Sequence, residues 1–451
     1  MNGPDLRTAG IAHPGALDGW LFGRRRTLRV FSLFALLMIF DFADRMLIAA
    51  LLPAIRLDWH ITDAQAGLLN SALTFGMIVF AFPVALAIDR WSRVKTAALM
   101  GGVWSVAGAL GGVAASFGPL LVARAVVGIG EAGYAPAAYS WIAAAFPRRH
   151  LQLGLGLFSA GAPVGMALGV AGAGYIAQHY GWRHAFGVVA LPGLLVAALL
   201  YFGADYRSGD LLVGAARADR RDREGPIRVS ASLSSRWRIL GVPSLLFSFF
   251  MSGMTMMQSV PVFYFLPTWL NRVHHFPLQK ASLLTSVLML LPVVGTPLGG
   301  WIMDRVTQRY RRAKLVYVAV AAAFCSVLNL SIFHFVGGWQ MQYGLLAISI
   351  LVGSTAVTAP MSMTQELVHP RGRAFSATCG VIASAALGSM PGPWITGLLS
   401  DRFGLGLALT VVTFVSGVLM VCAALLALRF YLRDLGKTAS AHGHTLAPAA
   451  T

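Results

Sequence analysis

The sequence predicts an all-α polytopic membrane protein with twelve transmembrane helices in two pseudo-symmetric six-helix bundles. Of its 451 residues, 57% are hydrophobic and only 12% are charged, whereas a soluble domain carries about 25% charged residues. Apolar runs of about 20 residues recur along the chain, and each is long enough to cross the hydrocarbon core of a membrane. One long polar segment, residues 205–242, separates six of these runs from the other six.

The apolar runs divide the chain in order. We expect a cytoplasmic N-terminal arm at 1–28, a first bundle at 29–204, a cytoplasmic central loop at 205–242, a second bundle at 243–433 and a cytoplasmic tail at 434–451. Each bundle contains six spans, and the central loop joins the two. The expected spans are 29–52, 65–88, 95–115, 119–146, 152–177, 184–204, 243–270, 280–303, 313–335, 339–364, 374–400 and 405–432.

The basic residues predict the orientation of these spans. If the N-terminus is cytoplasmic, 28 of the 35 lysines and arginines fall on the cytoplasmic side, five on the other side and two inside spans. This asymmetry follows the positive-inside rule, so we expect both termini in the cytoplasm of a bacterial-type inner membrane. The net charge of +18 thus reports topology, and we expect no nucleic-acid partner. The five basic residues on the sparse side are Arg56, Arg183, Arg272, Lys280 and Arg402.

An internal repeat supports two halves. Residues 89–95 carry an Asp-Arg pair and further basic residues after the second span, and residues 304–305 are an Asp-Arg pair at the end of the eighth. The fifth span contains Pro and Gly at 162–165 and the eleventh at 390–393, which are helix-weakening residues at a similar depth. A duplicated six-helix unit is the simplest explanation.

Two charged clusters lie inside spans, where ionisable residues are costly and mark solute pathways or proton relays. The first span carries Asp41, Asp44 and Arg45, and the fourth carries Arg124 and Glu131. The last two are seven positions apart and so share a helix face, about 10 Å apart along the axis. Three glycines in the same stretch leave room for a neighbouring helix to pack closely: Gly128, Gly130 and Gly133. We expect the two clusters to face each other across a solute pathway.

Each of these five residues has two alternative roles. Asp41, Asp44 and Glu131 suit proton coupling, because desolvation favours the protonated carboxyl whereas a neighbouring guanidinium opposes it. The alternative is static ion pairing, in which Asp44 binds Arg45 or Arg124 and holds one conformation. The two arginines do not release protons. They suit bidentate binding of a substrate phosphate or carboxylate, and the alternative is that they are counter-ions of the three acids.

Further residues are candidates for the substrate cavity. We expect Tyr134 in the fourth span, and Met257 and Tyr264 in the seventh, to contact substrate. Methionine and aromatic side chains line adaptable apolar cavities, although they also occur on lipid-facing helices. Pro261 and Pro267 interrupt the hydrogen-bond ladder of the seventh span, which favours a hinge there.

The twelve spans, the long central loop and the Gly-x-x-x-Asp-Arg-type loops resemble the major facilitator superfamily. In the first copy of the loop, Ala85 stands where the pattern has its leading glycine. The resemblance implies the major facilitator fold and a cytoplasmic gate held by ion pairs between the halves; the alternative is that these charges only anchor the loops. The implied gate residues are Asp89, Arg90, Arg93, Lys95, Asp304 and Arg305.

More narrowly, the segment Arg-Ala-Val-Val-Gly-Ile-Gly-Glu-Ala-Gly-Tyr at 124–134 is similar to the spinster branch. The Asp-Arg pair at 44–45 and the segment at 64–69 resemble the same branch, and Gly-Trp-Arg at 181–183 is shared by spinsters and organic-anion:proton symporters. Where this chain has Asp41, the branch often has asparagine. The resemblance implies a secondary transporter that rocks two halves around a central cavity, and eukaryotic spinsters are associated with export of sphingosine-1-phosphate and lysophospholipids.

We therefore expect a proton-coupled transporter, with protons or another ion as coupling partner. The expected solute is amphipathic or anionic, such as a lysolipid, a sphingoid lipid or a hydrophobic drug; the alternative is a small organic anion moved with protons. A channel or sensor is the rival class, and it predicts neither counter-ion dependence nor alternating access. We expect a monomer among membrane lipids, with no cofactor, no metal and no catalytic residues. ATP-driven transport is excluded because Tyr431 occupies the position of the first glycine that a phosphate-binding loop ending at Thr438 needs.

Overall fold

A computed structural model describes residues 19–205, 241–310, 312–335, 337–368 and 373–440. These residues are almost entirely helical and contain no strand. The predicted fold is confirmed: the described chain forms two bundles of six helical spans each. Most of the expected N-terminal arm, central loop and C-terminal tail lies outside the described residues.

In the first half, each expected span is one continuous helix. Residues near the ends of the helices explain several boundaries. The side chain of Ser92 caps α3 by accepting a hydrogen bond of 3.1 Å from the backbone N–H of Lys95. Gly181, with φ of +89°, turns the chain between α5 and α6 in a conformation that favours glycine. The helices are α1 (Arg24–Trp59), α2 (Asp63–Arg90), α3 (Arg93–Gly112), α4 (Phe117–Ala145), α5 (Arg148–Tyr180) and α6 (Trp182–Tyr201).

The second half contains more interrupted spans. The eleventh is broken by a π-helical turn before Pro391, as its Pro-Gly-Pro run predicts. By contrast, α5 continues through Pro163, and α9 continues through Pro261 and Pro267. The expected hinge in the seventh span stays a prediction. Prolines are tolerated in membrane helices because neighbouring groups satisfy the freed backbone carbonyls. The helical segments are α9 (Pro243–Val273), α10 (Leu278–Met289), α11 (Leu291–Arg309), α12 (Ala313–Leu330) with η4 (Ser331–Phe335), α13 (Trp339–Ala356), α14 (Thr358–Glu366), α15 (Arg373–Ser384), η6 (Ala385–Ser389), α16 (Pro391–Phe403) and α17 (Leu405–Ser440).

Nine helical segments in the described part are long and apolar enough to span a membrane. α1 is not among them, because every sufficiently long window of it holds more than two charged residues. It nevertheless packs along α5 and α6 in the centre of the first bundle. Charged residues make a membrane span costly to insert and indicate a functional role, as expected from the sequence.

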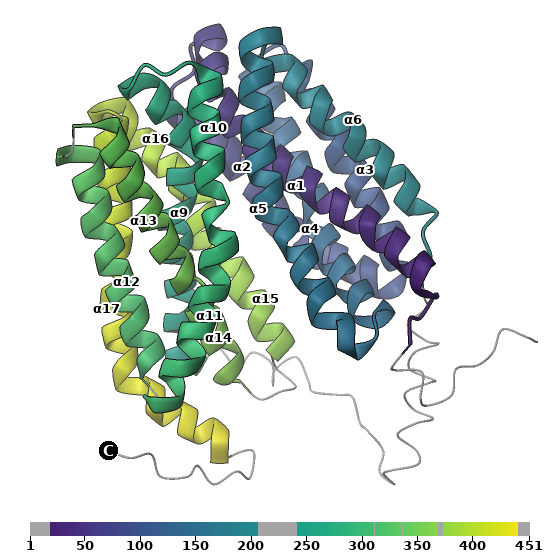
Figure 1. Cartoon of the computed structure of the whole chain (residues 1–451), viewed down its shortest axis with the longest axis vertical. Coiled ribbons are helices and arrows are strands. Elements are labelled where there is room, and N and C mark those ends of the chain that lie inside the picture. Colours follow the sequence, from purple (N-terminus) through teal and green to yellow (C-terminus); the bar gives the residue numbers. More distant parts are fainter. Residues whose placement is uncertain (1–18, 206–240, 311, 336, 369–372, 441–451) are drawn as a thin grey trace, which may run out of the picture.

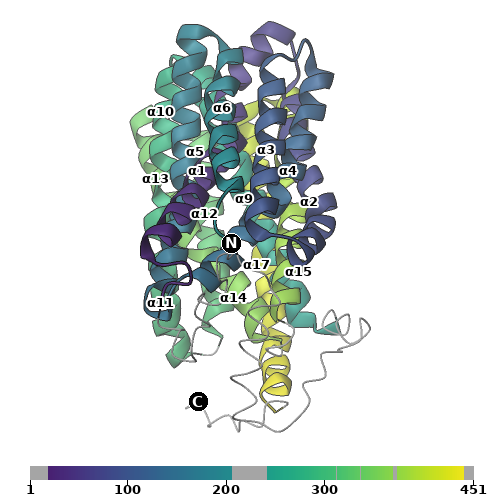
Figure 2. The ribbon, with the colours of Figure 1, turned by 90° about the vertical axis from the view of Figure 1, so that its right-hand side faces the viewer.

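The two halves meet at one end of the molecule. We call this end the apex, and we call the end where α1 begins and α17 finishes the base (Figures 1 and 2). At the apex α2 packs against α16, and α5 packs against α10. One apolar core extends across both halves there, from Leu47 of α1 to Leu270 of α9, whereas each half has its own separate core toward the base. The described conformation is therefore closed at the apex, and the halves diverge toward the base.

Glycines set the closest helix crossings. A Cβ added to Gly128 of α4 would collide with the carbonyl of Leu73 on α2, and one added to Gly130 would collide with the backbone of α3. The predicted role of these glycines in close packing is thus confirmed. At the apex, Gly67 of α2 and Gly397 of α16 each lie against the backbone of the opposite half. Without a hydrophobic force between helices in lipid, such close backbone contact is a main source of association.

Candidate functional site

Asp44 and Arg124 form a buried ion pair between α1 and α4. Nη1 of Arg124 donates to Oδ2 of Asp44 over 2.8 Å, and its Nη2 donates to the Asp44 carbonyl over 3.3 Å. Asp44 is fully buried and Arg124 is 2% exposed. Gly108 of α3 lies directly beside the carboxylate, where a Cβ would stand 3.1 Å from Oδ1. This pair is fixed by two hydrogen bonds and by packing from three helices.

Arg45 holds the other two acids more loosely. Its Nε lies 3.0 Å from Oε2 of Glu131, and its Nη2 lies 3.4 Å from Oδ2 of Asp41. The Glu131 side chain is buried, and its carboxyl group contacts that of Asp41 as well as Arg45. The Arg45 side chain is 20% exposed and rests on the ring of Phe42, 4.6 Å from its centroid. It is therefore the more accessible arginine of the two clusters.

The two clusters contact each other directly, within the first bundle. The prediction that they face each other across a solute pathway is wrong in this conformation, since Asp44 binds Arg124 and Arg45 binds Glu131. The physical reason is that an unpaired charge between membrane helices costs more than a paired one, so α1 and α4 bring opposite charges together. The alternative that treats Asp44 and Arg124 as an ion pair describes this arrangement.

The three predicted cavity residues occupy different positions. Tyr134 is fully buried, and its hydroxyl donates to the carbonyl of Phe34 within the first bundle. Tyr264 is also buried and donates to the carbonyl of Ala66 over 2.8 Å, which joins α9 to α2 across the halves. Met257 is partly exposed and packs beside Gly392, where η6 and α16 meet. Among these, only Met257 retains exposed surface, and contact of any of them with substrate stays a prediction.

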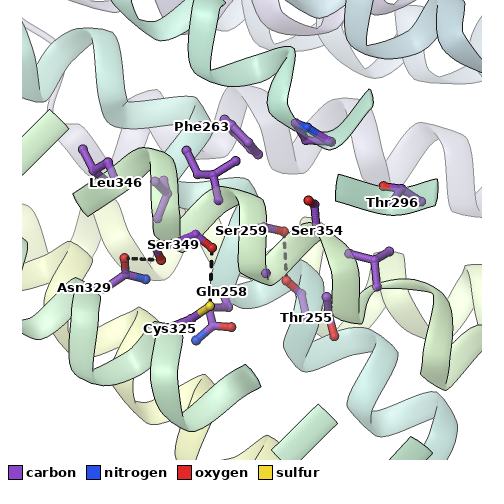
Figure 3. Close-up of a pocket in the computed structure, with 15 residues that line it drawn as sticks. Thr255, Gln258, Ser259, Phe263, Thr296, Cys325, Asn329, Leu346, Ser349 and Ser354 are labelled. Atoms are coloured by element: carbon purple, nitrogen blue, oxygen red, sulfur yellow. Dashed lines mark hydrogen bonds between the residues drawn. The ribbon is translucent and has the colours of Figure 1, made fainter. Parts of the chain in front are cut away.

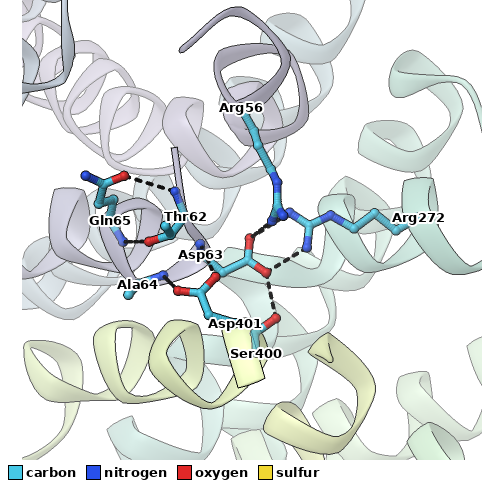
Figure 4. Close-up of polar contacts among 8 residues, drawn as sticks. All are labelled: Arg56, Thr62, Asp63, Ala64, Gln65, Arg272, Ser400 and Asp401. Carbon is cyan, nitrogen blue, oxygen red and sulfur yellow. Dashed lines mark hydrogen bonds and ion pairs between the residues drawn. The ribbon is translucent and has the colours of Figure 1, made fainter. Parts of the chain in front are cut away.

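The apex carries an ion cluster that the sequence analysis missed (Figure 4). Asp63, at the start of α2, receives a bidentate pair of 2.7 Å bonds from Arg272 of the other half and also contacts Arg56. Ser400 of α16 donates to the same carboxylate over 2.6 Å. Asp401 accepts from the backbone N–H groups of Asp63 and Ala64 over 2.7 and 3.0 Å, at the positive end of the α2 dipole. We call Arg56, Asp63, Arg272, Ser400 and Asp401 the apex cluster.

A second acid at the apex binds within one half. Asp58 accepts from Arg183 over 2.7 Å and from the indole of Trp182 over 3.2 Å, and these bonds lower the pKa of the exposed Asp58 carboxyl. The Gly-Trp-Arg motif thus ties the start of α6 to the end of α1. Three of the five basic residues on the sparse side, Arg56, Arg183 and Arg272, therefore pair with aspartates. Their position on the sparse side was the sequence signal that could have marked these arginines for attention.

The second half contains a cavity of about 210 Å³ between α9, α11, α12 and α13 (Figure 3). None of its lining residues is charged. Apolar side chains such as Phe263 and Ile350 alternate with hydroxyl and amide groups. The polar lining residues are Thr255, Gln258, Ser259, Thr296, Asn329, Ser349 and Ser354. The sequence analysis missed this cavity because its walls come from four spans far apart in the chain.

Comparisons with known proteins identify the family. The sequence model of the Major Facilitator Superfamily matches residues 33–382. The chain belongs to this superfamily. It is 26% identical over 385 residues to an MFS-type efflux pump of Mycolicibacterium smegmatis, covering 84% of this chain and 86% of the pump. It is also 26% identical over 375 residues to the protein spinster of Drosophila melanogaster, covering 80% of this chain and 60% of spinster.

A solved structure agrees with this membership. It is that of a bacterial homologue of the human lysosomal transporter Spinster, in an inward-facing and occupied conformation. The TM-score is 0.78 at 21% sequence identity, and the alignment covers 91% of this chain and 99% of that one. The expected superfamily and the resemblance to spinsters are thus confirmed. The family and fold are those of transporters and not of enzymes.

The superfamily gate residues lie at the base. The side chains of Asp89 and Arg90 are outside the described ones, and Arg93 begins α3. Lys95 is exposed over the ring of Tyr201, 5.5 Å from its centroid. On the other half, Asp304 is exposed and Arg305 stacks on Trp301 at 4.2 Å. A gate formed by these residues stays a prediction.

Proposed function

We propose that this protein is a proton-coupled secondary transporter that moves an anionic or amphipathic solute by alternating access, with its base in the cytoplasm. The distribution of basic residues supports that orientation. With the base inside, closure at the apex corresponds to a conformation closed to the outside. The apex cluster then acts as the outer gate, and the Asp-Arg loops act as the inner gate in the opposite conformation.

The observation that carries this proposal is the environment of Glu131. Glu131 is 3% exposed, its Oε2 lies 3.0 Å from Nε of Arg45, which is its ion-pair partner among the described residues, and its carboxyl also contacts that of Asp41. A carboxylate that depends on a single movable cation takes up a proton when that cation leaves, because an uncompensated charge inside the membrane is costly. Asp44 differs, because its partner Arg124 is itself only 2% exposed and is held in place by one bond to the Asp44 carboxylate and one to the Asp44 backbone carbonyl. We therefore assign proton transfer to Glu131, assisted by Asp41.

Arg45 connects the proton to the solute. An incoming carboxylate or phosphate competes with Glu131 and Asp41 for the guanidinium, which binds such groups bidentately. Because Arg45 is 20% exposed and Arg124 only 2%, Arg45 is the arginine that an anion can reach in this conformation. Substrate binding then frees Glu131 to accept a proton, and release of the proton returns Arg45 to Glu131. This competition couples movement of the solute to movement of the proton without a separate chain of proton-carrying residues.

The solute has two candidate classes. The leading one is a lysolipid, sphingoid lipid or hydrophobic drug, in keeping with the likeness to spinster and to an efflux pump. The second is a small organic anion moved with protons. The uncharged but hydrogen-bonding cavity of the second half favours this class, because a long acyl chain needs an unbroken apolar lining.

The test is proton movement in proteoliposomes that contain a trapped pH indicator. Lysophosphatidylcholine, sphingosine-1-phosphate and small carboxylates are added in turn, with and without an imposed pH gradient. We expect one class to trigger proton movement in the wild-type protein. Glu131→Gln should abolish that movement while it retains exchange of labelled solute, because glutamine keeps the shape but cannot carry the proton.

The matched control is Asp58→Asn, which neutralises an exposed carboxylate of the same bundle. It should leave proton movement unchanged. Solute-driven proton movement that persists in Glu131→Gln would show that Glu131 is a structural acid. Solute transport without any proton movement in the wild-type protein would refute the coupling itself.

A further inference from the structure

The cavity of the second half has a defined chemistry. Its lining residues carry no charge, so a charged group bound there would lie unpaired within the membrane. It measures about 210 Å³, and a closed apolar cavity of about 150 Å³ suffices to hold benzene. The space therefore suits one substituted ring, and it does not suit an extended acyl chain.

The hydrogen bonds of the wall leave specific atoms free. The Gln258 amide nitrogen donates to the hydroxyl of Ser326 over 3.1 Å and to the carbonyl of Thr413 over 3.2 Å, which fixes its orientation and leaves Oε1 available. The amide oxygen of Asn329 accepts from Ser349 over 3.0 Å, which leaves its nitrogen available. Thr296 has a hydroxyl without a partner among the described residues. The wall thus offers one acceptor, one amide donor and one hydroxyl that serves as either.

Other hydroxyl groups of the wall add acceptors. Ser259 donates to the carbonyl of Thr255 over 2.9 Å, and Ser354 donates to that of Leu351 over 2.7 Å. Each of these serines therefore donates its hydroxyl hydrogen to a carbonyl of its own helix, and its oxygen can still accept a hydrogen bond from an occupant. Polar atoms inside a membrane protein are normally satisfied, so free acceptors around an uncharged space indicate an occupant with hydrogen-bond donors.

We propose that this cavity binds the uncharged, ring-sized body of the transported solute, an aromatic or alicyclic group that carries hydroxyl or N–H donors. This inference rests on the proposed function and selects, within it, a compact organic anion over a long-chain lipid. The ring packs against Phe263 and Ile350, and its donors meet Gln258 and Thr296. The anionic end stays outside the cavity and is left to Arg45 in the first half.

The experiment measures binding to the purified full-length protein by thermal stabilisation, which does not require transport. The probes are 4-hydroxybenzoate and trans-4-hydroxycyclohexanecarboxylate, each compared with its analogue that lacks the hydroxyl, and oleoyl lysophosphatidate as the long-chain anion. We expect the hydroxylated probes to bind about tenfold more tightly than their analogues, as one hydrogen bond supplies. Thr296→Val should remove that difference, because valine keeps the shape of threonine and loses its hydroxyl.

Thr285→Val is the matched control, since the Thr285 hydroxyl donates to Ala281 of its own helix and does not line the cavity. It should leave the tenfold preference intact.

The outcomes separate this inference from the proposed function. Equal binding of hydroxylated and deoxy probes, no binding of either, or binding of the lysophosphatidate alone would overturn the subsite. Proton-coupled lysolipid transport together with any of these results would leave the proposed function standing. Conversely, a hydroxyl preference that Thr296→Val removes would establish the subsite even if Glu131→Gln still moved protons in liposomes.

Discussion

Replacing Asp44 with asparagine is expected to lower the free energy of unfolding by about 3–5 kcal/mol, because it leaves a buried guanidinium without its counter-ion. Arg124 is 2% exposed, and within the described residues its hydrogen bonds go to the carboxylate and the backbone carbonyl of Asp44. Asparagine can still accept one hydrogen bond, but it cannot neutralise the charge. The measurement is denaturation by SDS titration in mixed micelles, followed by tryptophan fluorescence.

The double variant Asp44→Asn/Arg124→Gln tests the cause. It removes both charges and keeps similar volumes, so most of the lost stability should return. Asp58→Asn is the control, because both side chains of the Asp58–Arg183 pair are more than 40% exposed and such pairs contribute less than about 1 kcal/mol. If the double variant is as unstable as Asp44→Asn, then packing against Gly108 and not the charge pair accounts for the effect.

The fold was predictable because its determinants are local. Apolar run length and the side on which basic residues fall depend on near neighbours in the chain, and both follow from the cost of placing polar groups in lipid. Interruptions were less predictable. Pro163 and Pro261 lie in unbroken helices, whereas the break before Pro391 follows a π turn. Whether a proline breaks a helix depends on which neighbours satisfy the freed carbonyl, and that is a property of the packing.

The candidate site was predictable only in part, for the same reason. Arg45 and Glu131 were recognisable because any charge in an apolar run needs an explanation. Their partners were not, since the rotation of α1 against α4 decides that Arg124 meets Asp44 while Arg45 meets Glu131. The cavity walls depend on how four helices pack. The apex cluster depends on residues as distant as Asp63 and Asp401, which only the meeting of the two halves brings together.

Replacing Asp63 with asparagine should shift the conformational equilibrium toward a state that is open at the apex. The Asp63 side chain is 4% exposed, and within the described residues it forms ion pairs with both Arg56 and Arg272. Without its charge, two arginines from opposite halves face each other, and the bidentate bond across the halves loses its ionic part. Because Arg272 is 30% exposed, we expect a cost of about 2 kcal/mol, or roughly a 30-fold change in the ratio of the two states.

The shift is measured by electron–electron double resonance between spin labels at Tyr180 and Lys280, in a background where the three native cysteines are alanine. These exposed positions lie at the ends of α5 and α10, which pack together at the apex. Asp63→Asn should increase the population of molecules with a longer distance between the labels. Arg272→Gln should do the same, and the two changes combined should give no further increase. Asp58→Asn should not, since its ion pair lies within one half. Unchanged distances in Asp63→Asn would mean that backbone packing at Gly67 and Gly397 keeps the apex closed. The apex cluster would then be a consequence of the closure and not its cause.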